Sequence, residues 1–135
     1  MEANEILSGL GQFTGTEQYH RITMLKNLLA TDGVAWLADK AKCYWLTDII
    51  ASYQPSIRKY ARARPNVAPL LDMQVWTLTK NKTTDGAKVI CTDGNSDTPI
   101  YSQRIPYTDF PLESIKIWVA PADKNNMVML LPSEH

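Results

Sequence analysis

The stretch MQVWTLTKNKTTDGAKVICTDG, residues 73–94, decides the fold. Its first seven residues have a period of two and are rich in the β-branched and aromatic side chains that favour strands. Asp85-Gly86 is a strong hairpin signal, and it leads into a second strand-like run over 87–92. We therefore expect an antiparallel pair of strands at this point of the chain.

Three further strands are expected after this pair. A turn at 93–95 leads to a run over 100–105, which completes a meander of three strands. The run over 115–120 has one fully apolar face, and 127–131 is apolar throughout, as in a strand that is covered on both faces. Residues 70–132 are therefore predicted to form a mainly antiparallel sheet of about five strands.

The first half of the chain has helical spacing instead. Apolar residues recur every three or four positions over 13–30, and a short helix is expected to start at Thr31 or Asp32. The strongest helical pattern runs over 42–54. Pro55 should break or restart that helix, because proline lacks the backbone donor.

Helices followed by strands are the order typical of an α+β fold. The prediction is one domain over residues 1–135, in which N-terminal helices (13–64) pack on the C-terminal sheet and residues 1–12 are flexible. A chain of 135 residues can bury a core of its own without metal or disulfide staples.

The charges of the chain balance, since 14 Lys and Arg face 14 Asp and Glu. Proteins that coat nucleic acid or anionic membranes carry a large basic excess, so these classes are disfavoured. The charges are distributed unevenly along the chain, however. Residues 1–68 carry eight basic and six acidic residues, and residues 69–135 carry six and eight.

The two cysteines, Cys43 and Cys91, stand in apolar or strand-like surroundings. We expect free, buried thiols of a reducing cytoplasm, and a bridge between the two stays open. Glu2 and Glu5 stand where a signal peptide needs positive charge, and no apolar run approaches the ~20 residues that span a bilayer. The expectation is a cytoplasmic protein that does not bind membranes.

His20 is the catalytic candidate, because it follows Glu17 by one helical turn. A carboxylate at that spacing can orient an imidazole for general acid–base chemistry. Asp48 or Asp109 would supply the second carboxylate of a small hydrolase. The alternative for His20 and Glu17 is an ordinary contact on a helix surface.

No cofactor and no metal are expected. Glycine-rich phosphate loops, a nucleophile elbow and closely spaced Cys/His pairs are all missing from the sequence. Residues 93–97 look like half of a calcium loop, but Thr98 and Arg104 stand where that loop needs Gly and Glu. A polar hairpin turn is the better interpretation.

Arg58, Arg62 and Arg64 are the candidates for nucleic-acid binding. Arg58 and Arg62 would share a helix face, and Tyr60 between them could stack on a base. The zero net charge favours the alternative, a solvated helix face. Nucleic acid is therefore the less favoured partner, and it stays open.

Several short strings are familiar as a set. They are FTGTEQY (13–19), TDGV (31–34), YWL (44–46), IAS (50–52), QVW (74–76), YTDFP (107–111) and LLPSE (130–134). Together they resemble an uncharacterised family of bacterial and phage domains that is catalogued only as a domain of unknown function. The resemblance implies a compact, stand-alone intracellular domain, and it carries no catalytic residue over to this chain.

The leading functional hypothesis is a non-enzymatic protein-binding or regulatory module, with a homodimer as one form of the contact. It rests on the missing catalytic constellation and on the sheet half, whose edge strand can pair with a partner. The alternatives are the hydrolase built on His20 and Glu17 and the nucleic-acid binder built on residues 58–64.

Overall fold

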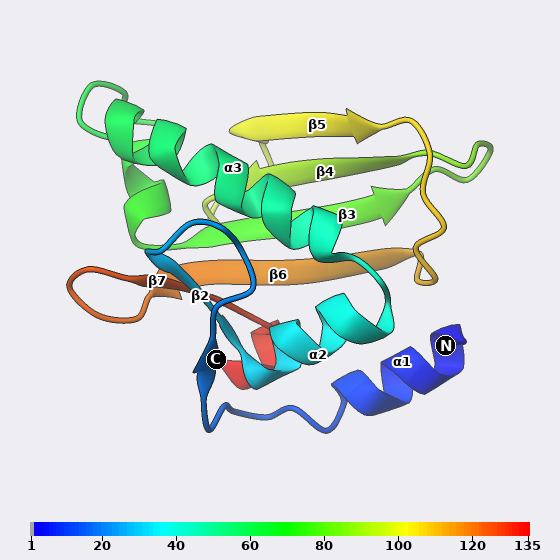
Figure 1. The fold of residues 1–135 in the computed structure, drawn as a ribbon. Helices are drawn as coiled ribbons and strands as arrows, with labels where there is room; N and C mark the ends of the chain where they lie inside the picture. Colours follow the sequence, from blue (N-terminus) through cyan, green and yellow to red (C-terminus); the bar gives the residue numbers. More distant parts are fainter. Residues whose placement is uncertain (1) are drawn as a thin grey trace.

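The computed structural model describes residues 2–135, and Met1 lies outside them. These 134 residues form three α-helices and two short 3-10 helices beside one seven-stranded sheet (Figure 1). The helices are α1 (Ala3–Leu10), α2 (Asp32–Lys40), α3 (Tyr44–Tyr60), η1 (Ala68–Leu71) and η2 (Pro132–Glu134). The strands are β1 (Tyr19–His20), β2 (Leu28–Thr31), β3 (Gln74–Lys80), β4 (Ala87–Thr92), β5 (Tyr101–Ile105), β6 (Ser114–Pro121) and β7 (Met127–Leu130).

The strand order in the sheet is β1-β2-β7-β6-β3-β4-β5. The pair predicted within residues 73–94 is confirmed as β3 and β4, with Trp76 opposite Cys91. The other three predicted strands are present as β5, β6 and β7. The α+β class is confirmed, but the sheet has seven strands rather than about five. It is also mixed, because β2 runs parallel to β7.

The helix expected over residues 13–30 is wrong. This segment forms β1, β2 and the turns around them, and Leu28 pairs with Met127 near the other end of the chain. The apolar spacing of the segment imitates a helix. A local pattern cannot report a partner strand so distant in sequence, and that pairing decides the conformation.

Helix α3 continues through Pro55 to Tyr60, so the break expected at the proline is also wrong. Leu46, Ile50 and Ile57 are buried along one side of the helix, on both sides of the proline. Burial of Ile57, which follows the proline, contributes about 1.5–3 kcal/mol, comparable with the ~3 kcal/mol that an interior proline costs. The ring of Pro55 is exposed.

Residues 1–12, which we expect to be flexible, contain the helix α1 from Ala3 onward. Ile6 is fully buried. Gly9 lies against Trp36 of α2, where an added Cβ would clash with the indole ring. Packing on α2 therefore holds α1 in place.

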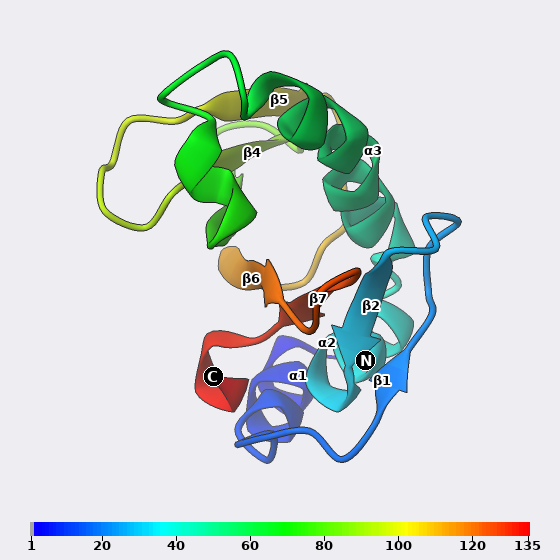
Figure 2. The same ribbon diagram turned by 90° about the vertical axis from the view of Figure 1, so that its left-hand side faces the viewer.

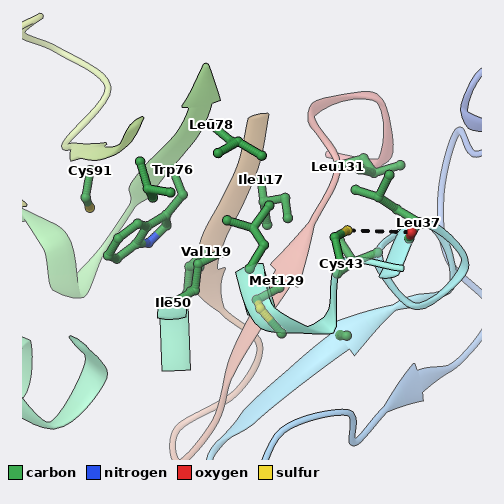
Figure 3. Close-up of a cluster of buried hydrophobic side chains, with 14 of the residues drawn as sticks. Leu37, Cys43, Ile50, Trp76, Leu78, Cys91, Ile117, Val119, Met129 and Leu131 are labelled. Atoms are coloured by element: carbon green, nitrogen blue, oxygen red, sulfur yellow. Dashed lines mark hydrogen bonds between the residues drawn. The ribbon is translucent and has the colours of Figure 1, made fainter. Parts of the chain in front are cut away.

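The main apolar core lies between α3 and one face of the sheet (Figure 3). Its inward-facing strand residues include Trp76, Leu78, Val89, Cys91, Ile117 and Val119. Figure 2 shows that no α-helix lies over the opposite face of β3 to β6 within residues 2–135. Lys88, Arg104 and Lys116 are exposed on that open face.

A polar pair ties α3 to the sheet inside this core. Gln54, which is 4% exposed, and Gln74, which is 0% exposed, exchange amide hydrogen bonds of 2.8 and 2.9 Å. Gln54 also donates to the Ile50 carbonyl at 3.0 Å. Gln74 donates to the Leu70 carbonyl at 3.1 Å and accepts from Trp76 Nε1 at 2.8 Å. All four amide N–H groups are therefore used.

Cys43 and Cys91 are both free and buried. Desolvation raises the pKa of each thiol to about 12. The Cys43 thiol donates a weak hydrogen bond to the Leu37 carbonyl, at 3.7 Å (Figure 3). None of the helices in residues 2–135 combines the length and the apolar content of a membrane-spanning segment.

Candidate functional site

The start of α2 gathers polar groups from separate parts of the chain. Thr16 Oγ1 accepts the Asp32 N–H at 2.9 Å, and the Glu17 N–H donates to Asp32 Oδ2 at 2.9 Å. His20 Nε2 lies 2.7 Å from Asp32 Oδ1. The hydrogen bond with His20 is the largest of the causes that lower the pKa of Asp32. Asp32, rather than the predicted Glu17, is therefore the carboxylate that orients His20.

A second carboxylate, that of Glu134, lies at the same helix end. Its oxygens accept from the Thr31 hydroxyl at 2.6 Å, the Gly33 N–H at 3.1 Å and the Leu131 N–H at 3.0 Å. A Cβ at Gly33 would lie 2.6 Å from Glu134 Oε1, so only glycine leaves room for this carboxylate. The negative charge suits the positive end of the α2 dipole.

These contacts fix the C-terminal segment on α2. The side chains of His20 and Asp32 are 36% and 29% exposed, so both are in contact with solvent. The neighbouring Thr16 hydroxyl already donates to the Gln18 carbonyl at 2.7 Å while it accepts from Asp32. We call this set of contacts among Thr16, Glu17, His20, Thr31–Gly33, Leu131 and Glu134 the α2 junction. It connects elements that are distant in sequence.

The other predicted catalytic residues lie elsewhere. Asp48 is exposed on α3 and lines a shallow hollow with Met24 and Ser52. Asp109 is exposed on the loop after β5, in a hollow that Trp45 and Tyr107 also line. The structure thus brings His20 and the Glu17 backbone together at α2, and it places Asp48 and Asp109 in two other hollows.

The three basic candidates do not lie in one row. Arg58 is exposed on α3 and lines a cavity of about 210 Å³ together with Asn27 and Asp123. Because α3 ends at Tyr60, Arg62 and Arg64 follow the helix, and the shared face expected for Arg58 and Arg62 is wrong.

The Arg64 guanidinium lies 4.3 Å from the centre of the Tyr60 ring. The ion pairs formed within residues 2–135 are His20–Asp32 and Lys40–Asp39, so none of Arg58, Arg62 and Arg64 is in an ion pair there.

No group of three or more His, Cys, Asp or Glu side chains within residues 2–135 could hold a metal ion. In the turn after β4, Asp93 Oδ1 accepts the N–H groups of Asn95 and Ser96, at 2.9 and 3.2 Å. Gly94 has a φ of 86°, which glycine adopts without strain. The carboxylate of Asp93 thus forms the turn.

A different region, the β5 edge of the sheet, leaves backbone hydrogen-bonding groups without a neighbouring strand. In the hairpin of β3 and β4, the Asn81 N–H bonds to the Gly86 carbonyl, and antiparallel ladders alternate from such a pair. This phase turns the backbone groups of Tyr101, Gln103 and Ile105 towards β4. The N–H and C=O groups of Ser102 and Arg104 therefore point outward, away from the sheet.

Aromatic side chains flank this open edge. Tyr53 of α3 packs on Tyr101, with 5.0 Å between ring centres, and its hydroxyl donates to Gln103 Oε1 at 3.1 Å. Burial raises the pKa of Tyr101. Trp45 and Tyr60, on the same side of α3, are only half-buried. Half-exposed aromatic residues along a backbone edge are typical of protein interfaces.

The loop after β5 adds a fully projecting aromatic side chain. Thr108 and Phe110 are buried, and the Thr108 N–H bonds to the Asp85 carbonyl at 2.8 Å. These anchors hold the loop while Tyr107 remains 69% exposed. We call β5 with its flanking residues the edge surface; they are Trp45, Tyr53, Tyr60, Tyr101–Ile105 and Tyr107.

Comparison with known proteins places the chain in a family. The model of a family described as "Family of unknown function (DUF6876)" matches residues 4–135. The chain belongs to the DUF6876 family. Neither a curated protein nor a solved structure matches it. The predicted resemblance to an uncharacterised domain family is therefore confirmed, and the DUF6876 description supplies no activity.

Two residues of the α2 junction, Asp32 and Glu134, are not among the predicted site residues. One weak signal for them exists in the sequence, since a glycine such as Gly33 inside a helical pattern is unfavourable unless close packing requires it. Five of the seven strings that carry the DUF6876 resemblance belong to these two regions. FTGTEQY, TDGV and LLPSE meet at the start of α2, whereas YWL and YTDFP contribute Trp45 and Tyr107 to the edge surface.

Proposed function

We propose that this protein is a non-enzymatic binding module that works through protein–protein contact at the edge surface. The carrying observation is the coincidence of an open backbone edge with half-exposed aromatic side chains. An extended partner segment can add a strand to such an edge. Main-chain hydrogen bonds then supply affinity, and the side-chain contacts supply specificity.

The two ends of the sheet support the choice of edge. β1 at one end has two residues, and His20 within it is already engaged with Asp32. β5 at the other end has five residues, and Figure 1 shows no strand or helix on its outer side within residues 2–135. The unpaired backbone groups of an edge strand can pair with another chain. A protein with an open edge therefore either uses this pairing for binding or has features that prevent it.

A cytoplasmic setting and a bacterial or mobile-element origin form part of the same proposal. Free thiols at Cys43 and Cys91 support the setting, because oxidising compartments favour disulfides. The resemblance of the sequence strings supports the origin.

Site-specific photo-cross-linking tests the proposed contact surface. A benzophenone amino acid at Ser102 lies on the edge, and the matched control at Lys124 lies on the exposed turn after β6. Irradiation of cells that produce the full chain should yield covalent protein adducts from position 102 and not from position 124. The absence of adducts from position 102, or equal adducts from both positions, would overturn the proposal.

A further inference from the structure

We infer that the partner at the edge surface is a second copy of this chain, paired β5 to β5 in an antiparallel register about a two-fold axis through Gln103. This inference rests on the proposed function and names its partner. Closed two-fold dimers use the same surface on both copies, so the surface must be complementary to itself.

The backbone of β5 meets the first requirement. Ser102 and Arg104 are the strand residues with outward N–H and C=O groups. A two-fold axis at Gln103 places Ser102 directly opposite Arg104 of the other copy, and each such pair exchanges two hydrogen bonds. The axis generates two such pairs, so the dimer gains four backbone hydrogen bonds.

The competing registers are weaker. Pairing must join outward-facing residues, so the alternatives centre the axis on Ser102 or on Arg104. Either alternative forms only one hydrogen-bonded pair between outward residues of β5. The axis at Arg104 also sets two arginines directly opposite each other, and like charges at that position are destabilising. The axis at Gln103 uses every outward group of β5 and pairs no like charges.

The side chains on the helix face of β5 are also complementary in this register. Tyr101 stands opposite Ile105 of the second copy, and aromatic residues pair well with β-branched residues across strands. Gln103 stands opposite its own copy, where two amides can exchange hydrogen bonds. On the open face, Arg104 stands beside a serine hydroxyl.

The helices supply the remaining area. Stable interfaces bury about 1,600 Å² in total, which is more than two five-residue strands provide. Tyr53 of α3 packs on β5 itself, and Trp45 and Tyr60 are half-buried on the same side of the helix. Continuing the sheet across the axis brings α3 of the second copy to the same face. These aromatic side chains then become the apolar part of the interface.

Charge substitutions at Ser102 test the register directly in the full chain. Ser102→Asp sets a carboxylate opposite Arg104 of the second copy twice per dimer, and Ser102→Arg sets like charges there twice. Sedimentation equilibrium should give a dimer for the unchanged protein. Ser102→Asp should tighten the dissociation constant and Ser102→Arg should weaken it, each by roughly 2–30-fold. Added salt should shrink both effects.

Proline substitution provides a backbone test with a matched control. Arg104→Pro removes an outward N–H and leaves the β4 ladder intact, because the Arg104 N–H does not face β4. Two of the four interface hydrogen bonds disappear, and dimerisation should weaken at least roughly tenfold. Arg104→Ala keeps the N–H and should weaken the dimer less. Far-ultraviolet circular dichroism verifies that each variant folds.

The outcomes separate this inference from the proposed function. A protein that stays monomeric at ~100 µM, or equal affinities for Ser102→Asp and Ser102→Arg, overturns the homodimer. If the position-102 cross-link then carries a mass other than one further copy of 15.2 kDa, the binding module stands and its partner is a different protein. Absence of any adduct from position 102 overturns both.

Discussion

The buried pair of Gln54 and Gln74 permits a sharp test of how α3, and with it the edge surface, is fixed on the sheet. Gln74→Met keeps the approximate side-chain volume but removes the amide. The Gln54 amide then loses one donor contact and one acceptor contact, and Trp76 Nε1 and the Leu70 carbonyl lose their partner. Each buried group left without a partner costs about 1–3 kcal/mol.

The free energies of unfolding should therefore fall unequally. We expect Gln74→Met to lower the free energy of unfolding by about 3.5 kcal/mol. This is a net value, in which the more apolar methionine offsets part of the cost of the unpaired groups. Gln54→Met should cost only about 1.5 kcal/mol, because Gln74 Oε1 keeps Trp76 and the Ile50 carbonyl keeps its helix bond. The double variant should cost about 2.5 kcal/mol, well below the sum, since no amide remains unpaired.

Urea denaturation followed by tryptophan fluorescence and circular dichroism measures these values, and Gln18→Met is the matched control. Gln18 is exposed, so its replacement should change stability by less than about 0.5 kcal/mol. Additivity of Gln54→Met and Gln74→Met within about 0.5 kcal/mol would refute the reasoning, because independent sites add and a shared network does not. A cost below about 1 kcal/mol for Gln74→Met would refute it equally.

Gly33→Ala should destabilise the protein by about 2 kcal/mol in urea melts, because its Cβ displaces the Glu134 carboxylate, and it should cost less in a Glu134→Ala background. The pKa of Asp32 is lowered in the folded protein, so its ionised carboxylate stabilises the fold. This contribution is present in full above pH ~4 and is lost as the pH falls below that value. Asp32→Asn should remove this pH-dependent part of the free energy of unfolding. The two buried thiols should resist a disulfide reagent until the chain unfolds. Because their folded pKa of about 12 lies above the ordinary 9.0, stability should fall between pH 9 and 12, by about 1.4 kcal/mol per thiol and pH unit.

The second half of the fold could be predicted from the sequence because its signals are local. The period of two in residues 73–79 and the turn at Asp85-Gly86 specify a hairpin whose strands are neighbours in the chain. The helix predicted over residues 13–30 is wrong because the contact that decides this segment is not local. The segment 28–31 is a strand because β7, near the other end of the chain, offers it a parallel partner. No periodicity within residues 13–30 encodes that contact.

Long-range contacts also decide the candidate site, and the sequence predicts only the local part of it. Spacing suggested that Glu17 would orient His20 across one turn of a helix, but His20 lies on a strand, and its partner Asp32 comes from the start of α2. The edge-strand hypothesis did not identify a strand, because strand order depends on long-range pairing. Because β2 and β1 cover the outer side of β7, the two edges of the sheet are β1 and β5, and β5 is the longer of them.

The exposure of Tyr107 is the observation that connects the loop sequence to the proposed contact. Thr108 and Phe110 anchor the loop through burial, and neither anchor requires an aromatic residue at position 107. A tyrosine that is 69% exposed contributes little to folding, since most of its ring stays in water. A large, rigid ring beside an open backbone edge does provide contact area at a low entropic cost. The loop therefore makes better physical sense as part of the edge surface than as a mere connection between β5 and β6.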